Sequence, residues 1–161
     1  MPQLQREIVI DAPPDAVFAF LAQPERMPEW TPGVRSVQLT SAGPIGVGST
    51  TETIVEIMGV KQTLVGRCTV FEPPHRLVVE NATARGFSVG GVSVGKVQST
   101  STSELAPEAA GTRLHARLEY TVSAGFLTGL AEGLMAPRMQ ADFEQSLQTL
   151  KRLLEAEPAV D

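Results

Sequence analysis

The clearest pattern in the sequence is an alternation of apolar and polar residues, with a period of two, around position 118. One face of this run carries only apolar or aromatic side chains and the other mainly charged ones: Leu114, Ala116, Leu118, Tyr120 and Val122 against Arg113, His115, Arg117 and Glu119. Because successive strand side chains point to opposite faces, the run predicts a strand with one buried face and one solvated face. The same rule turns Thr53, Val55 and Ile57 inward within residues 51–58.

Turn-forming residues divide the segment between Val34 and Val122 into several such runs. The breaks fall at residues 43–48, 58–61, 73–76, 86–95 and 107–111, which are rich in Gly and Pro. We therefore predict six strands in antiparallel meander order. A further strand over residues 4–11 precedes them, which gives a sheet of about seven strands.

Helical patterns flank this sheet. Pro13 and Pro14 start a short helix after the first strand, and further prolines limit the next segment to a helical turn over residues 25–30. Near the C-terminus, apolar residues recur at three-, four- and five-residue steps: Leu127, Leu130, Leu134, Met139, Phe143, Leu147, Leu150 and Leu154. This spacing predicts a long amphipathic helix that covers the inner face of the sheet. Pro137 predicts a kink or a mobile first half in that helix.

Length and composition agree with one domain of the α+β class over residues 1–161. The chain has 42% hydrophobic and 19% charged residues, which is ordinary for a globular protein. A formal charge of −5 and the absence of a Lys- or Arg-rich run argue against nucleic acid as a partner. No apolar stretch is long enough for a transmembrane segment, and the start lacks signal-peptide features, so we expect a cytoplasmic protein. The sequence leaves a homodimer open.

Four segments, taken in order, resemble the START-like, helix-grip (SRPBCC) superfamily, and within it the polyketide cyclase/dehydrase-type proteins. They are IDAPPDAVF at 10–18 running on to PEWTPGV at 28–34, GVGS at 46–49, FEPPHRL at 71–77 and LQTLKRLLE at 147–155. The resemblance implies a β-α-α-β6-α fold, in which a curved antiparallel sheet and the long C-terminal helix enclose a cavity for an apolar or amphipathic small molecule. The superfamily includes carriers, receptors, cyclases and chaperone co-activators, so the fold leaves the activity open.

Several chemical signals in the sequence are weak. Gly90 to Val97 falls one residue short of a phosphate-binding loop, and a β-prone run follows where a helix would be needed, so a flexible loop is the better interpretation. His75, His115 and Cys68 lack the spacing of a metal site. We expect solvated histidines, and a cysteine that packs inward beside Val70. No metal, cofactor or catalytic residue is predicted.

The polar candidates for ligand binding lie on predicted strands. If Lys96, Gln98 and Glu104 point outward, Ser99 and Ser101 face the helix, where buried hydroxyls need a partner such as water or a ligand. A bulge would reverse these faces, or the serines could bond across strands. Asn81 and Tyr120 are also expected to point inward, although a buried tyrosine is often structural.

Apolar candidates for the cavity wall come from the predicted strands, the helical turn and the C-terminal helix. They are Trp30, Ile57, Val79, Phe126, Leu130, Leu134 and Met139, each of which could equally belong to a plain core.

Three functions remain open at this stage. The first is carriage or sensing of an apolar or amphipathic small molecule, such as a lipid or polyketide. The second is a cyclase or dehydratase that uses the same cavity without a metal, and it would need an acid–base residue. Alternation places no Asp, Glu or His on the inner face, which favours binding over catalysis. The third is a protein-interaction module of the chaperone co-activator type.

Overall fold

The computed structural model describes residues 3–57, 59–84, 87–89, 92–125 and 128–156. It begins with strand β1 (Gln3–Ile10), helix α1 (Pro14–Leu21) and a 3-10 helix, η1 (Pro24–Glu29). Proline stands at the start of both helices, where its missing N–H costs nothing. The predicted short helix and helical turn are therefore confirmed.

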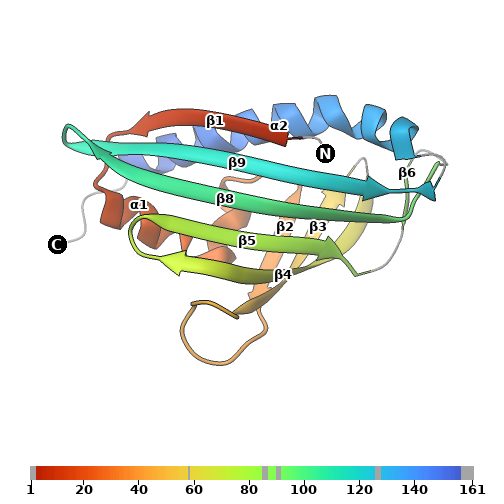
Figure 1. Ribbon diagram of the computed structural model, residues 1–161, viewed down its shortest axis with the longest axis horizontal. Helices are drawn as coiled ribbons and strands as arrows, with labels where there is room; N and C mark the ends of the chain where they lie inside the picture. The colour runs from red at the N-terminus through yellow and green to blue at the C-terminus, as the bar shows by residue number, and fades with distance from the viewer. Residues whose placement is uncertain (1–2, 58, 85–86, 90–91, 126–127, 157–161) are drawn as a thin grey trace.

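Seven strands form one antiparallel sheet in the order β1-β9-β8-β5-β4-β3-β2 (Figure 1). The strands after η1 are β2 (Val34–Leu39), β3 (Thr50–Ile57), β4 (Val60–Glu72), β5 (Arg76–Thr83), β8 (Lys96–Glu108) and β9 (Gly111–Ser123). They follow one another as a meander, and β1 closes the sheet beside β9. This is the predicted number and order.

The segment expected to be a flexible loop between β5 and β8 contains two short strands, β6 (Phe87–Val89) and β7 (Val92–Val94). They pair with each other and form a separate two-stranded sheet. The loop prediction is thus wrong for these residues. Their Val, Phe and Ser content suits strands, and the glycines that suggested a loop stand between them and at their ends.

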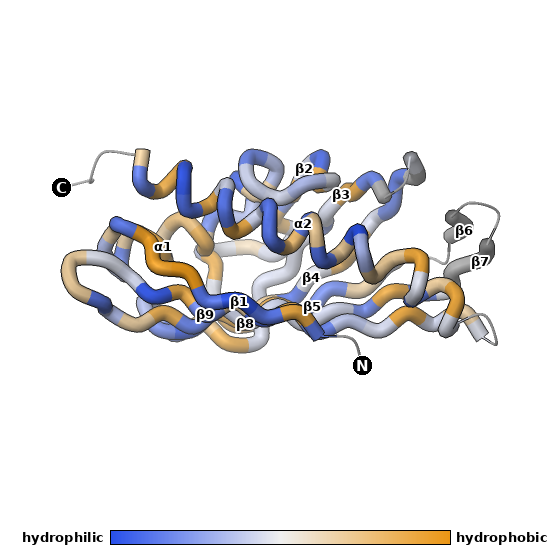
Figure 2. The backbone as a smooth tube through the Cα atoms, turned by 90° about the horizontal axis from the view of Figure 1, so that it is seen from above, coloured by the Kyte–Doolittle hydropathy of each residue, from blue (hydrophilic) through white to orange (hydrophobic). Residues whose placement is uncertain are grey.

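The long helix α2 (Thr128–Ala156) is continuous through Pro137. It lies over the sheet between the β1 edge and the β2–β3 edge, as Figure 2 shows from above. Its second half is fastened to the start of the chain: Glu155 accepts a hydrogen bond from the Asp11 backbone N–H at 2.8 Å, and Arg6 forms an ion pair with Glu144.

Buried apolar side chains form two separate clusters. The first core cluster joins α1, the sheet and the second half of α2; it comprises Ile10, Ala12, Val17, Phe18, Phe20, Cys68, Leu77, Leu105, Leu114, Ala116, Leu147, Leu150 and Leu154. The second core cluster joins the sheet to the first half of α2; it comprises Val97, Tyr120, Val122, Ala131 and Met135. Within the described residues, no helix is long and apolar enough to cross a membrane.

Candidate functional site

A row of residues crosses five neighbouring strands on the face that α2 covers. The strand registers pair Thr51 with Gly66, Gly66 with Asn81, Asn81 with Ser99, and Ser99 with Tyr120. Directly paired residues of antiparallel strands present their side chains on the same face. Tyr120 belongs to the second core cluster, so the whole row, which we call the polar row, faces the helix.

Gly66 lets two polar side chains meet at the centre of this row. A Cβ atom at Gly66 would lie 2.4 Å from Thr51 Oγ1 and 2.6 Å from Asn81 Oδ1, which are impossibly short separations. The hydroxyl and the amide therefore converge over the glycine from the two neighbouring strands. They offer a donor and acceptor group above the middle of the sheet.

A second row runs parallel to the first, one step further along the strands. Cys68 pairs with Val79, Val79 with Ser101, and Ser101 with Leu118. Cys68 is 3% exposed, whereas the other three are only partly buried. Ser99 and Ser101 therefore lie on the helix side of β8, and Lys96, Gln98 and Glu104 lie on the solvent side.

Partial exposure of these side chains points to space between sheet and helix. Asn81, Ser99, Ser101 and Leu118 sit in interior strands, with a hydrogen-bonded strand on each side. Because their side chains point toward α2, solvent can reach them only from the volume between α2 and the sheet. The two core clusters thus leave these side chains partly accessible to solvent.

Tyr120 stands at the end of the polar row and is 2% exposed. Within the described residues, its hydroxyl has no hydrogen-bond partner. Burial, together with the negative charge of Glu132 on α2, raises the pKa of the phenol above its ordinary value. Tyr120 therefore stays protonated at neutral pH and can donate a hydrogen bond.

The remaining predicted site residues are not gathered at the two rows. Trp30 ends η1 and packs against the first core cluster, where its indole Nε1 is buried without a hydrogen-bond partner among the described residues. Met139 packs against the second core cluster. The side chain of Ile57, at the end of β3, and the whole of Phe126 lie outside the described residues.

The predicted contact face of the first half of α2 needs correction. Leu130 is 53% exposed and Leu134 is 46% exposed, whereas Ala131 is 1% and Met135 is 3% exposed. The apolar residues that the sequence analysis assigned to a single face of this helix therefore lie on two different strips of it. Ala131 and Met135 lie four residues apart on one strip, whereas Leu130 and Leu134 form a neighbouring strip.

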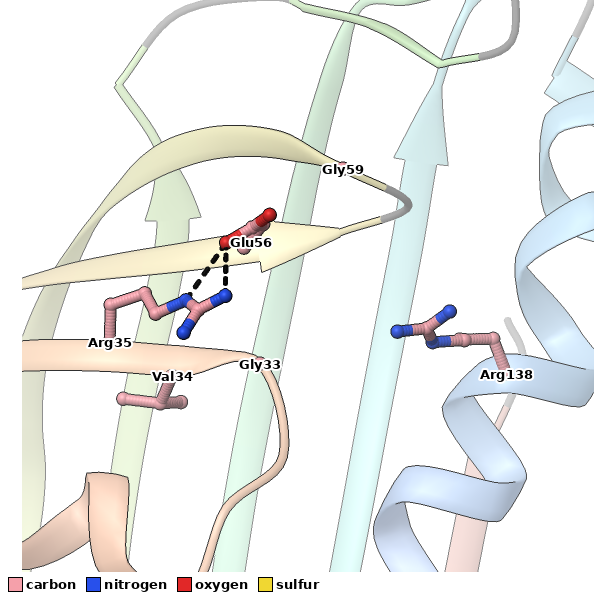
Figure 3. Close-up of a pocket in the computed structure, with 6 residues that line it drawn as sticks. All are labelled: Gly33, Val34, Arg35, Glu56, Gly59 and Arg138. Atoms are coloured by element: carbon pink, nitrogen blue, oxygen red, sulfur yellow. Dashed lines mark hydrogen bonds and ion pairs between the residues drawn. The ribbon is translucent and has the colours of Figure 1, made fainter.

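A pocket of about 270 Å³ lies where α2 approaches the β2–β3 edge (Figure 3). Its lining consists of Gly33, Val34, Arg35, Glu56, Gly59 and Arg138. Gly33 and Gly59 both have a φ of +82°, which only glycine adopts readily, so these turns require glycine. None of these six was among the predicted site residues. The one sequence signal for Arg138 is its position four residues after Leu134.

A second groove, of about 530 Å³, runs between β1 and α2. The Arg6–Glu144 ion pair belongs to its lining, so the groove already contains a pair of opposite charges.

The histidines and the cysteine, for which no metal-binding or catalytic role was predicted, have ordinary surroundings. His75 is exposed in a turn, and His115 lies on the outer face between Gln5 and Glu104. Cys68 faces inward, and burial raises the pKa of its thiol. Cys68 lies beside Val70, whose backbone carbonyl accepts a hydrogen bond from the thiol at 3.4 Å, but a bulge between the two residues pairs Val70 with the outward Val78, so the two side chains are on opposite faces. Among the described residues, no three His, Cys, Asp or Glu side chains form a metal-binding group.

A seven-stranded antiparallel sheet that wraps around a long C-terminal helix defines the helix-grip class of α+β proteins. The chain belongs to the family described as polyketide cyclase/dehydrase and lipid transport, whose model matches residues 1–155. Membership implies binding of hydrophobic ligands. No curated protein matches the sequence.

Solved structures support the fold. TTHA0849 from Thermus thermophilus has a TM-score of 0.75 at 20% identity, and the match covers 98% of this chain and 100% of that one. CV1439 from Chromobacterium violaceum has a TM-score of 0.68 at 21% identity, over 96% and 98% of the two chains. Ara h 8.0201 has a TM-score of 0.63 at 11% identity, over 97% and 99%.

Proposed function

We propose that this protein binds an apolar or amphipathic small molecule between α2 and the inner face of the sheet. One observation carries the proposal: side chains in the two central rows remain partly exposed although strands flank them and a helix covers them. In a closed core these positions would be as buried as Leu114, which is 1% exposed. Burial of apolar ligand surface supplies the affinity.

The polar groups at the site are better suited to orienting a ligand by hydrogen bonds than to acid–base catalysis. Asn81 and Ser99 offer hydrogen bonds beside the Tyr120 hydroxyl. The register turns no Asp, Glu or His of the described strands toward α2, so a proton-transfer mechanism would have to depend on the phenol or on the helix. We therefore place binding ahead of cyclase or dehydratase activity.

The proposal is tested by uptake of N-phenyl-1-naphthylamine, a neutral apolar fluorophore, combined with native mass spectrometry of the purified protein. We expect saturable uptake at one probe per chain. Replacing Ser101→Leu, which puts a larger side chain into the central space, should weaken uptake by about tenfold or more, since steric overlap costs more than about 1.4 kcal/mol.

Thr100→Leu is the matched control. Thr100 is the neighbour of Ser101 in β8 and pairs with Glu80 and Glu119 on the outer face. The Thr100→Leu variant should bind the probe as tightly as the unmodified protein does. Equal uptake by both variants would show that the probe does not occupy the space between sheet and helix, and absence of uptake by the unmodified protein would overturn the proposal.

A further inference from the structure

Arg138 reaches from α2 toward the pocket at the β2–β3 edge. In Figure 3 its guanidinium group points from the helix toward Glu56 and Gly59. The side chain is 53% exposed, and its Nε forms an ion pair with Asp142 Oδ2 at 3.6 Å, a separation too long for a hydrogen bond. Its donors are therefore largely available to a ligand.

The opposite wall of the pocket carries a second guanidinium. Arg35 bonds to Glu56 through Nε at 2.8 Å and through a terminal nitrogen at 2.5 Å, and both bonds end on the same carboxylate oxygen, Oε2. Glu56 thereby neutralises Arg35 but not Arg138. The pocket lining contains two arginines and one carboxylate, and Asp142, the ion-pair partner of Arg138, stands outside the lining.

Exposed apolar residues lie next to this charge on α2, and the inner face of β3 begins beside it. On α2, the exposed Leu134 and Leu130 precede Arg138 at four-residue steps, so they lie near it on the helix surface. On β3, Glu56 lies on the outer face, and the buried Val55 and Thr53 next to it lie on the inner face in line with Thr51 of the polar row. From Glu56 to Thr51 the strand measures about 17 Å at the usual rise per strand residue.

We propose that the pocket holds the acidic head group of the ligand, a carboxylate that Arg138 binds, while an apolar tail extends toward the polar row. The inference rests on the proposed function and narrows it to elongated amphipathic carboxylic acids. A carboxylate matches the planar guanidinium with two parallel hydrogen bonds. Asp142 already lies beside Arg138 in an ion pair, and a monoanion brings less additional negative charge next to that carboxylate than a doubly charged phosphate would.

The test measures how well dodecanoate and dodecanol displace N-phenyl-1-naphthylamine from the protein. The two competitors have the same tail and differ only in the head group. Both are used below their aggregation limits. Arg138→Gln should weaken the binding of dodecanoate by about tenfold or more, since a hydrogen bond to a charged group contributes roughly that factor to affinity. Dodecanol binding should not change. Glu56→Gln, which releases Arg35 for the ligand, should strengthen dodecanoate binding and leave dodecanol unaffected.

Arg152→Gln removes an exposed arginine from α2 outside the pocket lining and serves as the control for net charge. Two results would overturn the proposed head-group site at Arg138: an unchanged ratio of dodecanoate to dodecanol affinity in Arg138→Gln, or an equal change of that ratio in Arg152→Gln. Neither result would contradict the proposal that the protein binds an apolar or amphipathic small molecule. If neither the probe nor dodecanol binds to the unmodified protein, the proposed function fails and the head-group site fails with it.

Discussion

At the scale of single residues, Gly66 determines the shape of the inner face. It is buried in the middle of β4, and the Thr51 hydroxyl and the Asn81 amide occupy the volume that a side chain would take. A glycine within a strand weakens that strand, so its presence suggests a local need for space. Here the space is occupied by polar groups that face α2.

Gly66→Ala should destabilise the protein by about 1–3 kcal/mol, because the added methyl group overpacks a filled site. This cost exceeds the gain of roughly 0.5–1 kcal/mol that alanine brings by restricting the unfolded chain. Urea unfolding measures the difference. Gly46→Ala is the control, since nothing lies within 4 Å of its added Cβ, and it should stay within about 0.5 kcal/mol. Equal stability of the two variants would mean that Thr51 and Asn81 move aside freely.

At the scale of elements, α2 presents two different strips in its first half. Met135 is 3% exposed and packs in the second core cluster, whereas its neighbour Leu134 is 46% exposed. The two residues have similar volumes and stand side by side in the sequence. Their stability effects should nevertheless differ strongly.

Met135→Ala should lower the free energy of unfolding by about 2–5 kcal/mol, the usual cost of a cavity in a packed core. Leu134→Ala should change it by no more than about 0.5 kcal/mol, as expected for a surface position. Chemical denaturation of both variants measures this contrast. A large loss for Leu134→Ala would place Leu134, rather than Met135, against the sheet.

Strand alternation and turn residues were sufficient to predict most of the architecture. Because a strand has a strict period of two, the charges on β9 and at the ends of β8 fix their faces, and this brought Ser99 and Tyr120 correctly to the helix side. Helical phase was harder to read, because apolar residues on α2 occupy two adjacent strips. The pocket around Arg138 could not be predicted, since its parts are separated by about a hundred residues and meet only through tertiary packing.

At the scale of the whole molecule, stability should depend on pH in the alkaline range. Burial raises the pKa of the Cys68 thiol above 9.0, and burial together with Glu132 raises that of the Tyr120 phenol above 10.0. The unfolded chain then ionises first, so the folded state binds more protons over this interval. Both contributions to stability are fully present below about pH 9 and are lost as the pH rises through the raised pKa values.

We therefore expect the free energy of unfolding to fall as the pH rises above about pH 9. The double substitution Cys68→Ala and Tyr120→Phe should make this fall shallower, because neither ionising group remains. Urea titrations at several pH values measure the slope. If both proteins lose stability at the same rate, the alkaline sensitivity arises elsewhere, for example from lysine deprotonation.

The division of the core into two clusters has a consequence for the route by which a ligand would enter between α2 and the sheet. The second half of α2 is held by Leu147, Leu150 and Leu154 and by the bonds to the N-terminal segment, whereas the first half contributes only Ala131 and Met135 to a buried cluster. Lifting the first half would break the smaller cluster and leave the larger one intact. The first half of α2 is therefore the part of the helix with the least apolar burial against the sheet, so an opening at that end would disturb the fewest buried contacts.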